Sequence, residues 1–284
     1  MKHLLFLALP LLLMACKPSC RQTPPEPSNP RLTSHASPLT SPATTSTTTP
    51  ATTPVATPVA SASGAPEQIL HRTGYTTSYN RDTRNPNWVA WHLTKDHTYG
   101  RHQRSQEVFT EDTDVTPRAT DNDYYNSRYD RGHMCPAGDN KWDATAMSES
   151  FLFTNICPQN HALNKYEWNK LEIQCRDWAR RYGAIDIVCG PVYDHATPTR
   201  TIGRNRVWVP DAFFKVVLCR TGQPKAIGFL VRNNGKKVSL ESLVRTVDDI
   251  ERLTGFDFFS DLDDKVEQRI EAAADLKEWE LLNE

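Results

Sequence analysis

Short apolar runs, several of them rich in Val, Ile and aromatic residues, recur between residues 74 and 231 of the 284-residue chain. In one run, Trp88, Val89, Trp91 and Leu93 give the composition that favours a β-strand. Polar or turn-forming residues flank each run, as is usual at strand ends. We therefore expect strands at Gly74–Asn80, Asn87–Thr94, Ile185–Cys189, Val207–Val209, Phe213–Cys219 and Ile227–Val231, and an extended segment from Tyr129 to His133.

Helix signals lie between and after these runs. The expected helices are Asp143 to about Phe151, Asn164 to Tyr182 with Gly183 after it, Leu240–Leu253 after Ser239, and Leu262–Leu282 after Ser260. The segments Asp96–Tyr125 and Thr154–His161 are expected to be irregular, and Gly190-Pro191 to end a strand. This order follows no regular β-α-β repeat, so it predicts an α+β fold with a mixed or antiparallel sheet and flanking helices.

The first residues have the pattern of an export signal. Lys2 and His3 precede an apolar run, Leu4–Leu13, which is too short to span a bilayer. The run ends in Leu13-Met14-Ala15-Cys16, which resembles the cleavage site of bacterial lipoproteins, where the cysteine receives lipid. We expect residues 1–15 to be a lipoprotein signal peptide and Cys16 to anchor the mature protein, with an ordinary secretory signal as the alternative. Attached acyl chains contribute about 0.8 kcal/mol per buried methylene, enough for firm anchoring.

Residues 16–66 are dominated by Pro, Thr, Ser and Ala and hold almost no charge. Such a composition buries too little apolar surface to offset its ordering entropy, so it predicts an extended, disordered stalk. A Pro-rich ligand for another domain is the alternative. Residues 67–284 then have a length that suits one domain. These features together predict an exported protein, lipid-anchored to the bacterial envelope in the outer membrane, the periplasm or the cell surface.

Charge is unevenly distributed along the expected domain. Residues 67–247 hold 25 basic and 20 acidic residues, whereas residues 248–284 hold 4 basic and 13 acidic ones. The larger part is therefore mildly basic, which is compatible with a polyanionic ligand, and the C-terminal part is acidic.

The expected domain also contains five cysteines, and Cys20 lies in the stalk. Outside the cytoplasm these can form disulfides, and Cys135 can brace the segment around it. Five cysteines cannot all pair with one another, and spacing does not choose the partners of Cys135, Cys157, Cys175, Cys189 and Cys219.

The segment Asp130–Asp139 carries the most specific chemistry in the chain. His133 has an ordinary pKa near 6.5, so it suits a general base at neutral pH. Arg131, two residues earlier, suits a phosphate clamp, with a structural ion pair to Asp130 as the alternative. Asn164 offers the hard oxygen ligand that Mg²⁺ prefers, or else only caps a helix. Glu172 follows eight residues later, so both can lie on one side of a helix.

Three segments in this order resemble the DNA/RNA non-specific endonucleases, of the endonuclease G type within the ββα-metal superfamily. The segments are Asp130–His133, Asn155–Gln159 and Leu163–Glu172, and Val209–Lys215 adds weaker support. The resemblance reaches from about Gly74 to Arg232. It implies a ββα-metal nuclease fold and a Mg²⁺-dependent endonuclease, with Mn²⁺ as a substitute ion, that cleaves DNA and RNA at low sequence preference and leaves 5′-phosphate ends.

The resemblance also assigns roles to residues. It implies that His133 is the general base, that Asn164 binds the metal directly, and that Glu172 binds metal-coordinated water. Arg104, ahead of its neighbour Arg101, would stabilise the transition state, and Asn155 would orient the site. Asp139, Lys165 and Trp168 are expected to be structural or to lie at the rim.

Other interpretations stay open at this point. His133, Cys135, Cys157 and His161 include zinc-binding residue types, but their spacing follows no common zinc module. A lipoprotein that captures DNA without cleaving it, or a disulfide-braced structural protein of the envelope, are alternatives to an enzyme. The sequence also leaves open the preference for DNA or RNA, the biological role, the membrane leaflet and the oligomeric state, including a homodimer.

Overall fold

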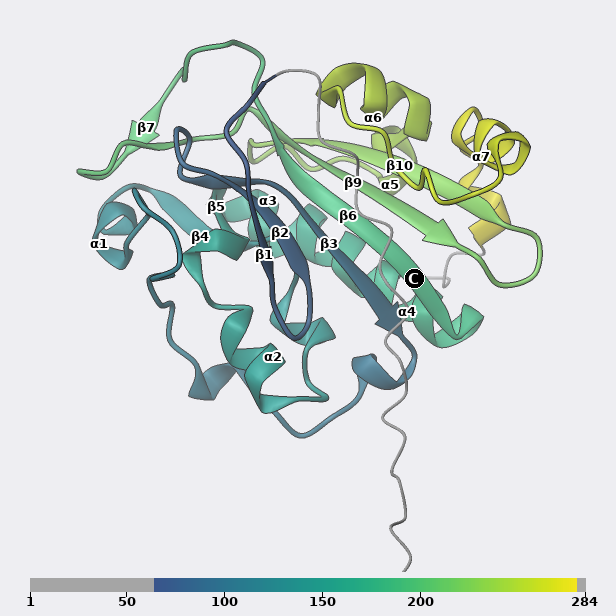
Figure 1. Ribbon diagram of the computed structural model, residues 1–284, viewed down its shortest axis with the longest axis horizontal. Helices are drawn as coiled ribbons and strands as arrows, with labels where there is room; N and C mark the ends of the chain where they lie inside the picture. Colours follow the sequence, from purple (N-terminus) through teal and green to yellow (C-terminus); the bar gives the residue numbers. More distant parts are fainter. Residues whose placement is uncertain (1–63, 280–284) are drawn as a thin grey trace, which may run out of the picture. The chain divides into compact units, whose positions relative to one another are not determined.

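The computed structural model describes residues 64–279, and a central antiparallel sheet organises them (Figure 1). Within these residues the sheet has seven strands in the order β1-β2-β3-β6-β9-β10-β11. Every neighbouring pair is antiparallel. The strands are β1 Gln68–His71, β2 Thr76–Asn80, β3 Asn85–Thr94, β6 Ala184–Val192, β9 Ala212–Cys219, β10 Lys225–Arg232 and β11 Val244–Arg245.

Helices lie against both faces of this sheet. They are α1 Asp121–Tyr124, α2 Ala144–Glu149, α3 His161–Leu163, α4 Asn169–Tyr182, α5 Leu240–Leu243, α6 Val247–Thr254 and α7 Asp264–Glu271. In β9, Phe213 and Val217 pack in one core with α4, whereas Phe214 and Val216 pack in a second core with α6 and α7. Both faces are therefore buried, which explains why β9 is continuously apolar apart from Lys215. The predicted α+β fold with an antiparallel sheet and flanking helices is confirmed.

A two-stranded antiparallel hairpin, whose strands are joined by the long connection 134–155, forms a second, smaller sheet. Its strands are β4 Tyr129–His133 and β5 Ile156–Asn160, and they pair so that His133 lies opposite Ile156. The expected loop at Thr154–His161 is wrong, because most of this segment is the strand that completes the hairpin. Gly132 is required here, since a Cβ at this position would come within 2.2 Å of the Gln159 side chain.

The long helix begins earlier than predicted. Asn160 caps it by accepting hydrogen bonds from the backbone N–H groups of Ala162 and Leu163, so Asn164 lies inside the helix instead of opening it. A π-helical turn at Asn164–Trp168 joins α3 to α4. The predicted end is confirmed, because α4 stops at Tyr182 and Gly183 follows with a φ of 88°.

Two boundary predictions fail for reasons of sheet pairing. Strand β6 continues through Gly190-Pro191, because Pro191 pairs with Phe213 in β9 beyond the last residue that pairs with β3. The expected helix at Leu240–Leu253 is interrupted by β11, which pairs with β10.

The caps of the last helices also differ from the prediction. Thr246 caps α6 and Asp263 caps α7, so Ser260 has no such role and Ser239 precedes only the short α5. The sequence pattern also missed β1 and β7 Thr201–Ile202. The strand expected at Val207–Val209 is confirmed as β8 Val207–Trp208, which pairs with β7.

Some predictions fall on residues that the structure does not describe. These are the signal peptide 1–15, the lipidated Cys16 and almost all of the linker 16–66. Among residues 64–279, no helix is long and apolar enough to cross a membrane.

Within residues 64–279, all five cysteines are free and buried. All five, among them Cys135 and Cys157, pack in the core between the sheet and α4. The expectation that disulfides brace this domain is therefore not met, and a disulfide-braced structural protein loses its support.

Candidate functional site

A cavity of about 490 Å³ opens where the hairpin meets the long helix. His133 and Arg131 line it from β4, Asn164 and Glu172 from the helix, and Arg104 from a 3-10 turn at Arg104–Gln106. These residues are far apart in the sequence. The antiparallel pairing of β4 and β5 places the helix start next to Tyr129, and a hydrogen bond from Trp168 to the backbone oxygen of His133 joins the helix to the end of β4.

The His133 side chain is held between aromatic rings. Its ring centroid lies 5.3 Å from that of Phe109 and 4.8 Å from that of Phe151, the latter in an edge-on arrangement. Its backbone oxygen accepts a hydrogen bond of 3.1 Å from Nε1 of Trp168. Among residues 64–279, Nε2 of His133 has no hydrogen-bond partner. Burial, together with the positive charge of Arg104, lowers the pKa of His133 to about 3, so the imidazole is neutral at physiological pH.

Arg131 is positioned by partners other than the expected one. Its Nε donates to Oδ1 of Asp121 at 2.6 Å, and its guanidinium lies over the rings of Phe109 and Tyr124. The alternative of an ion pair with Asp130 is wrong, because Asp130 accepts from Asn164 instead. The Arg131 guanidinium has five N–H donors, so its anchor leaves donors for a ligand in the cavity.

Asn164 lies in the π-helical turn, a feature that is frequent at functional sites. Its Nδ2 donates a hydrogen bond of 2.9 Å to Oδ2 of Asp130. The same carboxylate oxygen lies 3.0 Å from Nδ1 of His161. Because the amide nitrogen is engaged, the amide oxygen is the atom that Asn164 retains for a metal ion.

Glu172 is a half-buried carboxyl group on the wall of this cavity. Burial raises the pKa of Glu172 to about 7, although the positive charges of Lys215 and Arg176 act against this shift. A carboxylate in such an environment is stabilised by a further cation. This is the electrostatic setting in which a divalent ion binds favourably.

Lys215 is a buried cation to which the sequence alone assigned no role. Its side chain is 1% exposed, and its Nζ lies 4.9 Å from the ring centroid of Trp91 and 4.5 Å from that of Trp168. The carboxylates of Glu172 and Asp139 help to raise the pKa of Lys215 against the effect of burial. The positive charge of Lys215 therefore acts on Glu172 from the buried side, although Lys215 does not itself line the cavity.

Arg104 and Arg101 are separated by the structure. Arg104 lines the cavity and acts electrostatically on both His133 and Glu172. Arg101 is exposed and does not line this cavity. The geometry therefore favours Arg104 as the arginine of the site, in line with the sequence expectation.

Asn155 does not face the cavity, although the sequence analysis placed it with the catalytic group. It is fully buried, its Oδ1 accepts from the backbone N–H of Cys135, and its Nδ2 donates to the backbone oxygens of Cys135 and Ser150. Its own backbone oxygen accepts from the N–H of Met134. Asn155 thus fixes the chain immediately after His133 and positions the site.

Further polar residues of the cavity were missed as site residues or expected only at its rim. They are Gln103, Asp130, Lys141, His161, Lys165, Asn169 and Arg176. Arg176 is anchored by Oδ1 of Asp139 at 2.9 Å, and Oδ2 of that buried carboxylate accepts from Trp91. The helical spacing Glu172 to Arg176 was the available signal for Arg176, since residues four apart share a helix face.

The zinc interpretation finds no support in the geometry. Among residues 64–279, His133, Cys135, Cys157 and His161 do not form a cluster of metal-binding atoms. Burial raises the pKa values of the Cys135 and Cys157 thiols well above the usual range, so these thiols stay protonated.

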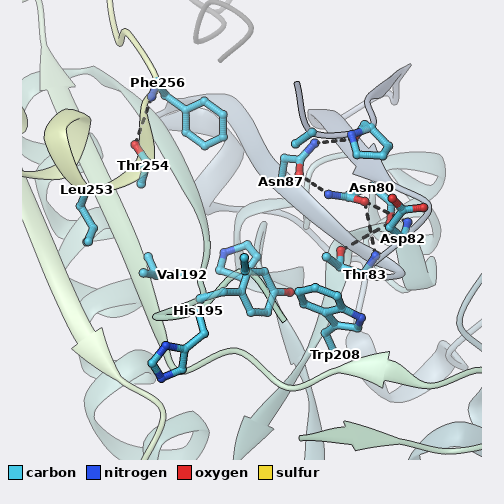
Figure 2. A pocket seen from close by; sticks show the side chains of 15 residues that line it. Asn80, Asp82, Thr83, Asn87, Val192, His195, Trp208, Leu253, Thr254 and Phe256 are labelled. Carbon is cyan, nitrogen blue, oxygen red and sulfur yellow. Dashed lines mark hydrogen bonds between the residues drawn. The ribbon is translucent and has the colours of Figure 1, made fainter. Parts of the chain in front are cut away.

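A second cavity, of about 400 Å³, lies between the end of β6, the β2–β3 turn and the end of α6 (Figure 2). Its amides are satisfied internally, since Nδ2 of Asn80 donates to Oδ1 of Asn87, and Oδ1 of Asn80 accepts from the backbone of Asp82 and Thr83. His195 is exposed at its edge (Figure 2). No cluster of basic side chains lines this cavity, in contrast to the first.

Comparison with known proteins agrees with the site geometry. The sequence model of the DNA/RNA non-specific endonuclease family matches residues 52–265. The mitochondrial nuclease EXOG of Xenopus laevis is 36% identical over 208 residues, covering 66% of this chain and 57% of that protein. Nuclease C1 of Cunninghamella echinulata var. echinulata is 34% identical over 216 residues, covering 70% of this chain and 86% of that protein.

A solved structure shares the fold. A chain in the crystal structure of the EndoG/EndoGI complex is 27% identical, with a TM-score of 0.66, and the match covers 70% of this chain and 88% of that one. The present chain spans only a little over half the length of the EXOG nucleases that it matches. On the extent of the family match, the chain belongs to the DNA/RNA non-specific endonuclease family.

Proposed function

We propose that the protein is a metal-dependent endonuclease that hydrolyses phosphodiester bonds in DNA and RNA with low sequence preference. One observation carries the proposal: the unpartnered Nε2 of His133 belongs to a neutral imidazole in the same cavity as Asn164, Glu172 and three arginines. A base, an oxygen ligand for a hard cation and phosphate-binding cations are the groups that this hydrolysis needs.

The charges of the cavity support a nucleic-acid substrate. Arg104, Arg131, Lys141, Lys165 and Arg176 all line it. Cations arranged in this way bind phosphates, which are common to DNA and RNA and carry no base sequence. Low discrimination between sequences therefore follows from the chemistry of the lining.

In the proposed mechanism, Nε2 of His133 accepts the proton of a water molecule that attacks the phosphorus. The rings of Phe109 and Phe151 restrict the imidazole, and Trp168 fixes its backbone, so the base is oriented before the substrate arrives. Arg131, anchored by its ion pair with Asp121, binds the phosphate and stabilises its growing negative charge. Arg104 does the same from the 3-10 turn at Arg104–Gln106.

The residues present fit a Mg²⁺ ion, with Mn²⁺ as a substitute. Asn164 would hold the ion through its amide oxygen, and Glu172 would bind a water molecule of the ion. The fit rests on the hard-oxygen donor set and on the buried carboxyl group of Glu172, whose raised pKa indicates that a cation would stabilise its charged form. When bound, the metal supplies Lewis-acid stabilisation of the phosphorane and of the leaving 3′ oxygen.

The test is cleavage of supercoiled plasmid and of a single-stranded RNA by the purified protein in Mg²⁺. We expect both substrates to be cut, and excess EDTA to abolish cutting. His133→Ala should lower the rate by about 10³-fold or more, because it removes the general base. His195→Ala is the matched control, since this exposed histidine lies at the second cavity (Figure 2).

Two results would refute the proposal. One is cleavage that persists in His133→Ala or in EDTA. The other is salt-dependent DNA binding by the wild-type protein without cleavage in Mg²⁺, which would support a DNA-capture lipoprotein instead.

We also propose that the protein is exported and anchored to the bacterial envelope by lipid on Cys16. The support is the sequence Leu13-Met14-Ala15-Cys16 after a short apolar run. With the native leader, we expect labelled palmitate to be incorporated and the protein to sediment with membranes, whereas Cys16→Ser should prevent both. Equal labelling of the two proteins would reject the anchor.

A further inference from the structure

Three carboxylates converge between the last two helices of the described chain. Asp248 and Glu251 lie on α6, three residues apart, and Glu271 is the last residue of α7. One oxygen of each lies within 4.8 Å of the others. Two oxygens bound to one calcium ion lie at most about twice the calcium–oxygen distance of roughly 2.3–2.6 Å apart, so a single ion can contact all three.

Glu271 distinguishes this cluster from an ordinary acidic surface. Its side chain is only 5% exposed, and among residues 64–279 its Oε1 has no hydrogen-bond partner. A buried carboxylate oxygen without a partner carries a large desolvation cost. Because its ligand atom is one of the three that converge, the orphaned carboxyl group points to a missing ligand at the cluster.

The charged groups that act on Glu271 are negative, so they do not stabilise its carboxylate. Those acting on it most strongly are the carboxylates of Glu251, Glu267, Asp248 and Asp257. The nearby Arg252 is paired with Asp249 instead. Among residues 64–279, the groups that act most strongly on Glu271 therefore leave the negative charge of the cluster unneutralised.

One carboxyl group of the cluster is also held in a fixed position. Oε1 of Glu251 accepts a hydrogen bond of 2.8 Å from the backbone N–H of Phe258, so the carboxyl group of Glu251 is held in place. Phe258 itself is fully buried in the core that α6 and α7 share with the sheet. The ends of the two helices are thus fixed relative to each other before any ion binds.

We infer that Asp248, Glu251 and Glu271 form a calcium-binding site that joins α6 to α7. Three carboxyl groups supply oxygen ligands and leave the remaining positions of a six- to eight-coordinate ion to water, which suits Ca²⁺ better than the strictly octahedral Mg²⁺. The site shares no residue with the cavity that contains His133 and Asn164. Its role is structural, because it joins the two acidic C-terminal helices that cover the face of the sheet opposite α4.

The test uses the full chain carrying Asn164→Ala, so that metal binding in the nuclease cavity does not interfere. Isothermal titration calorimetry with Ca²⁺ alone should show one ion bound per chain. The melting temperature should rise on the order of 5 °C at a calcium concentration 100 times the Kd. Adding Asp248→Asn and Glu251→Gln should abolish both effects.

A second variant guards against loss of folding. Glu271→Gln keeps the shape of the side chain and removes one of several crowded negative charges, so the calcium-free variant should melt no lower than its parent. Its calcium affinity should fall at least about tenfold. Glu241→Gln on α5, an exposed position outside the cluster, is the matched control and should bind calcium like its parent.

Two results would overturn the inference. One is the absence of a calcium signal in the Asn164→Ala parent at millimolar concentration. The other is unchanged binding in both cluster variants.

Discussion

The carboxyl group of Glu172 allows a sharp test of the site electrostatics through the variant Glu172→Gln. In the metal-free protein, burial raises the pKa of Glu172 from the ordinary 4.5 to about 7. Below pH 4.5 the group is protonated in both the folded and the unfolded state. Between pH 4.5 and 7 the unfolded state loses the proton first, so stability falls as the pH rises, and above pH 7 the loss is complete.

The size of the effect follows from the shift. One pKa unit corresponds to about 1.4 kcal/mol, so the free energy of unfolding should drop by about 3 kcal/mol across this range. Glutamine does not ionise, so Glu172→Gln should remove this part of the pH dependence. The variant and the wild type should therefore differ by about 3 kcal/mol more at pH 8 than at pH 4.5, with the variant the more stable at pH 8.

The assay is urea denaturation in EDTA at pH 4.5, 6, 7 and 8, with ΔG of unfolding compared between proteins at each pH. Glu278→Gln, at an exposed position outside the cavity, should keep the pH dependence of the wild type. In Mg²⁺ the variant should be the less active of the two proteins, because it should lose metal affinity and cleavage. A difference between Glu172→Gln and wild type that stays constant with pH would refute the reasoning.

Three further predictions concern the other residues of the site. Arg104→Ala should lower plasmid cleavage about 10²-fold because it removes a transition-state cation, whereas Arg101→Ala should retain activity close to wild type; equal losses would contradict the assignment. Asn155→Ala should lower the free energy of unfolding by about 3 kcal/mol in urea denaturation, because it leaves buried backbone groups without partners. An unchanged stability would show that the hydrogen bonds of the Asn155 side chain are dispensable. Lys215→Met should also lower the free energy of unfolding by about 3 kcal/mol. Because a buried cation is lost, the variant should raise the pKa of Glu172 further, which NMR titration in EDTA would show. An unchanged pKa of Glu172 would exclude an electrostatic role of Lys215 at the site.

Local sequence signals predicted the elements that depend on local chemistry. The capping residue Asp143 accepts a hydrogen bond from the N–H of Ala146 at the start of α2, as expected. Gly183 ends α4 with a positive φ, and the apolar runs of β3, β9 and β10 became central strands. These features need only neighbouring residues or a buried sheet, so a single sequence was sufficient.

The failures occurred where a distant partner decides the structure. Residues 156–160 contain Pro158 and polar residues, and they are a strand only because β4 pairs with them. Similarly, Val244–Arg245 breaks an expected helix because β10 offers an edge for pairing. Backbone hydrogen bonds to a distant strand outweigh local helix preference at such positions.

The sequence by itself determined the chemical identity of the site and the order of its parts. Residue types and spacing, together with the resemblance that they carry, predicted His133, Arg131, Asn164 and Glu172 as the residues of the site. The family match on residues 52–265 confirms the family, and the roles of these residues stay predictions.

Only the tertiary structure decided how those parts are held and which groups surround them. It placed Arg104 and not Arg101 in the cavity, buried Lys215 where its charge acts on Glu172, and directed Asn155 to the backbone instead of the cavity. It also brought Glu271 against α6 at a cluster that no motif marks. The physical reason is that burial and charge proximity depend on contacts between residues distant in the chain, and these contacts set the pKa values and unmet hydrogen bonds from which both sites were inferred.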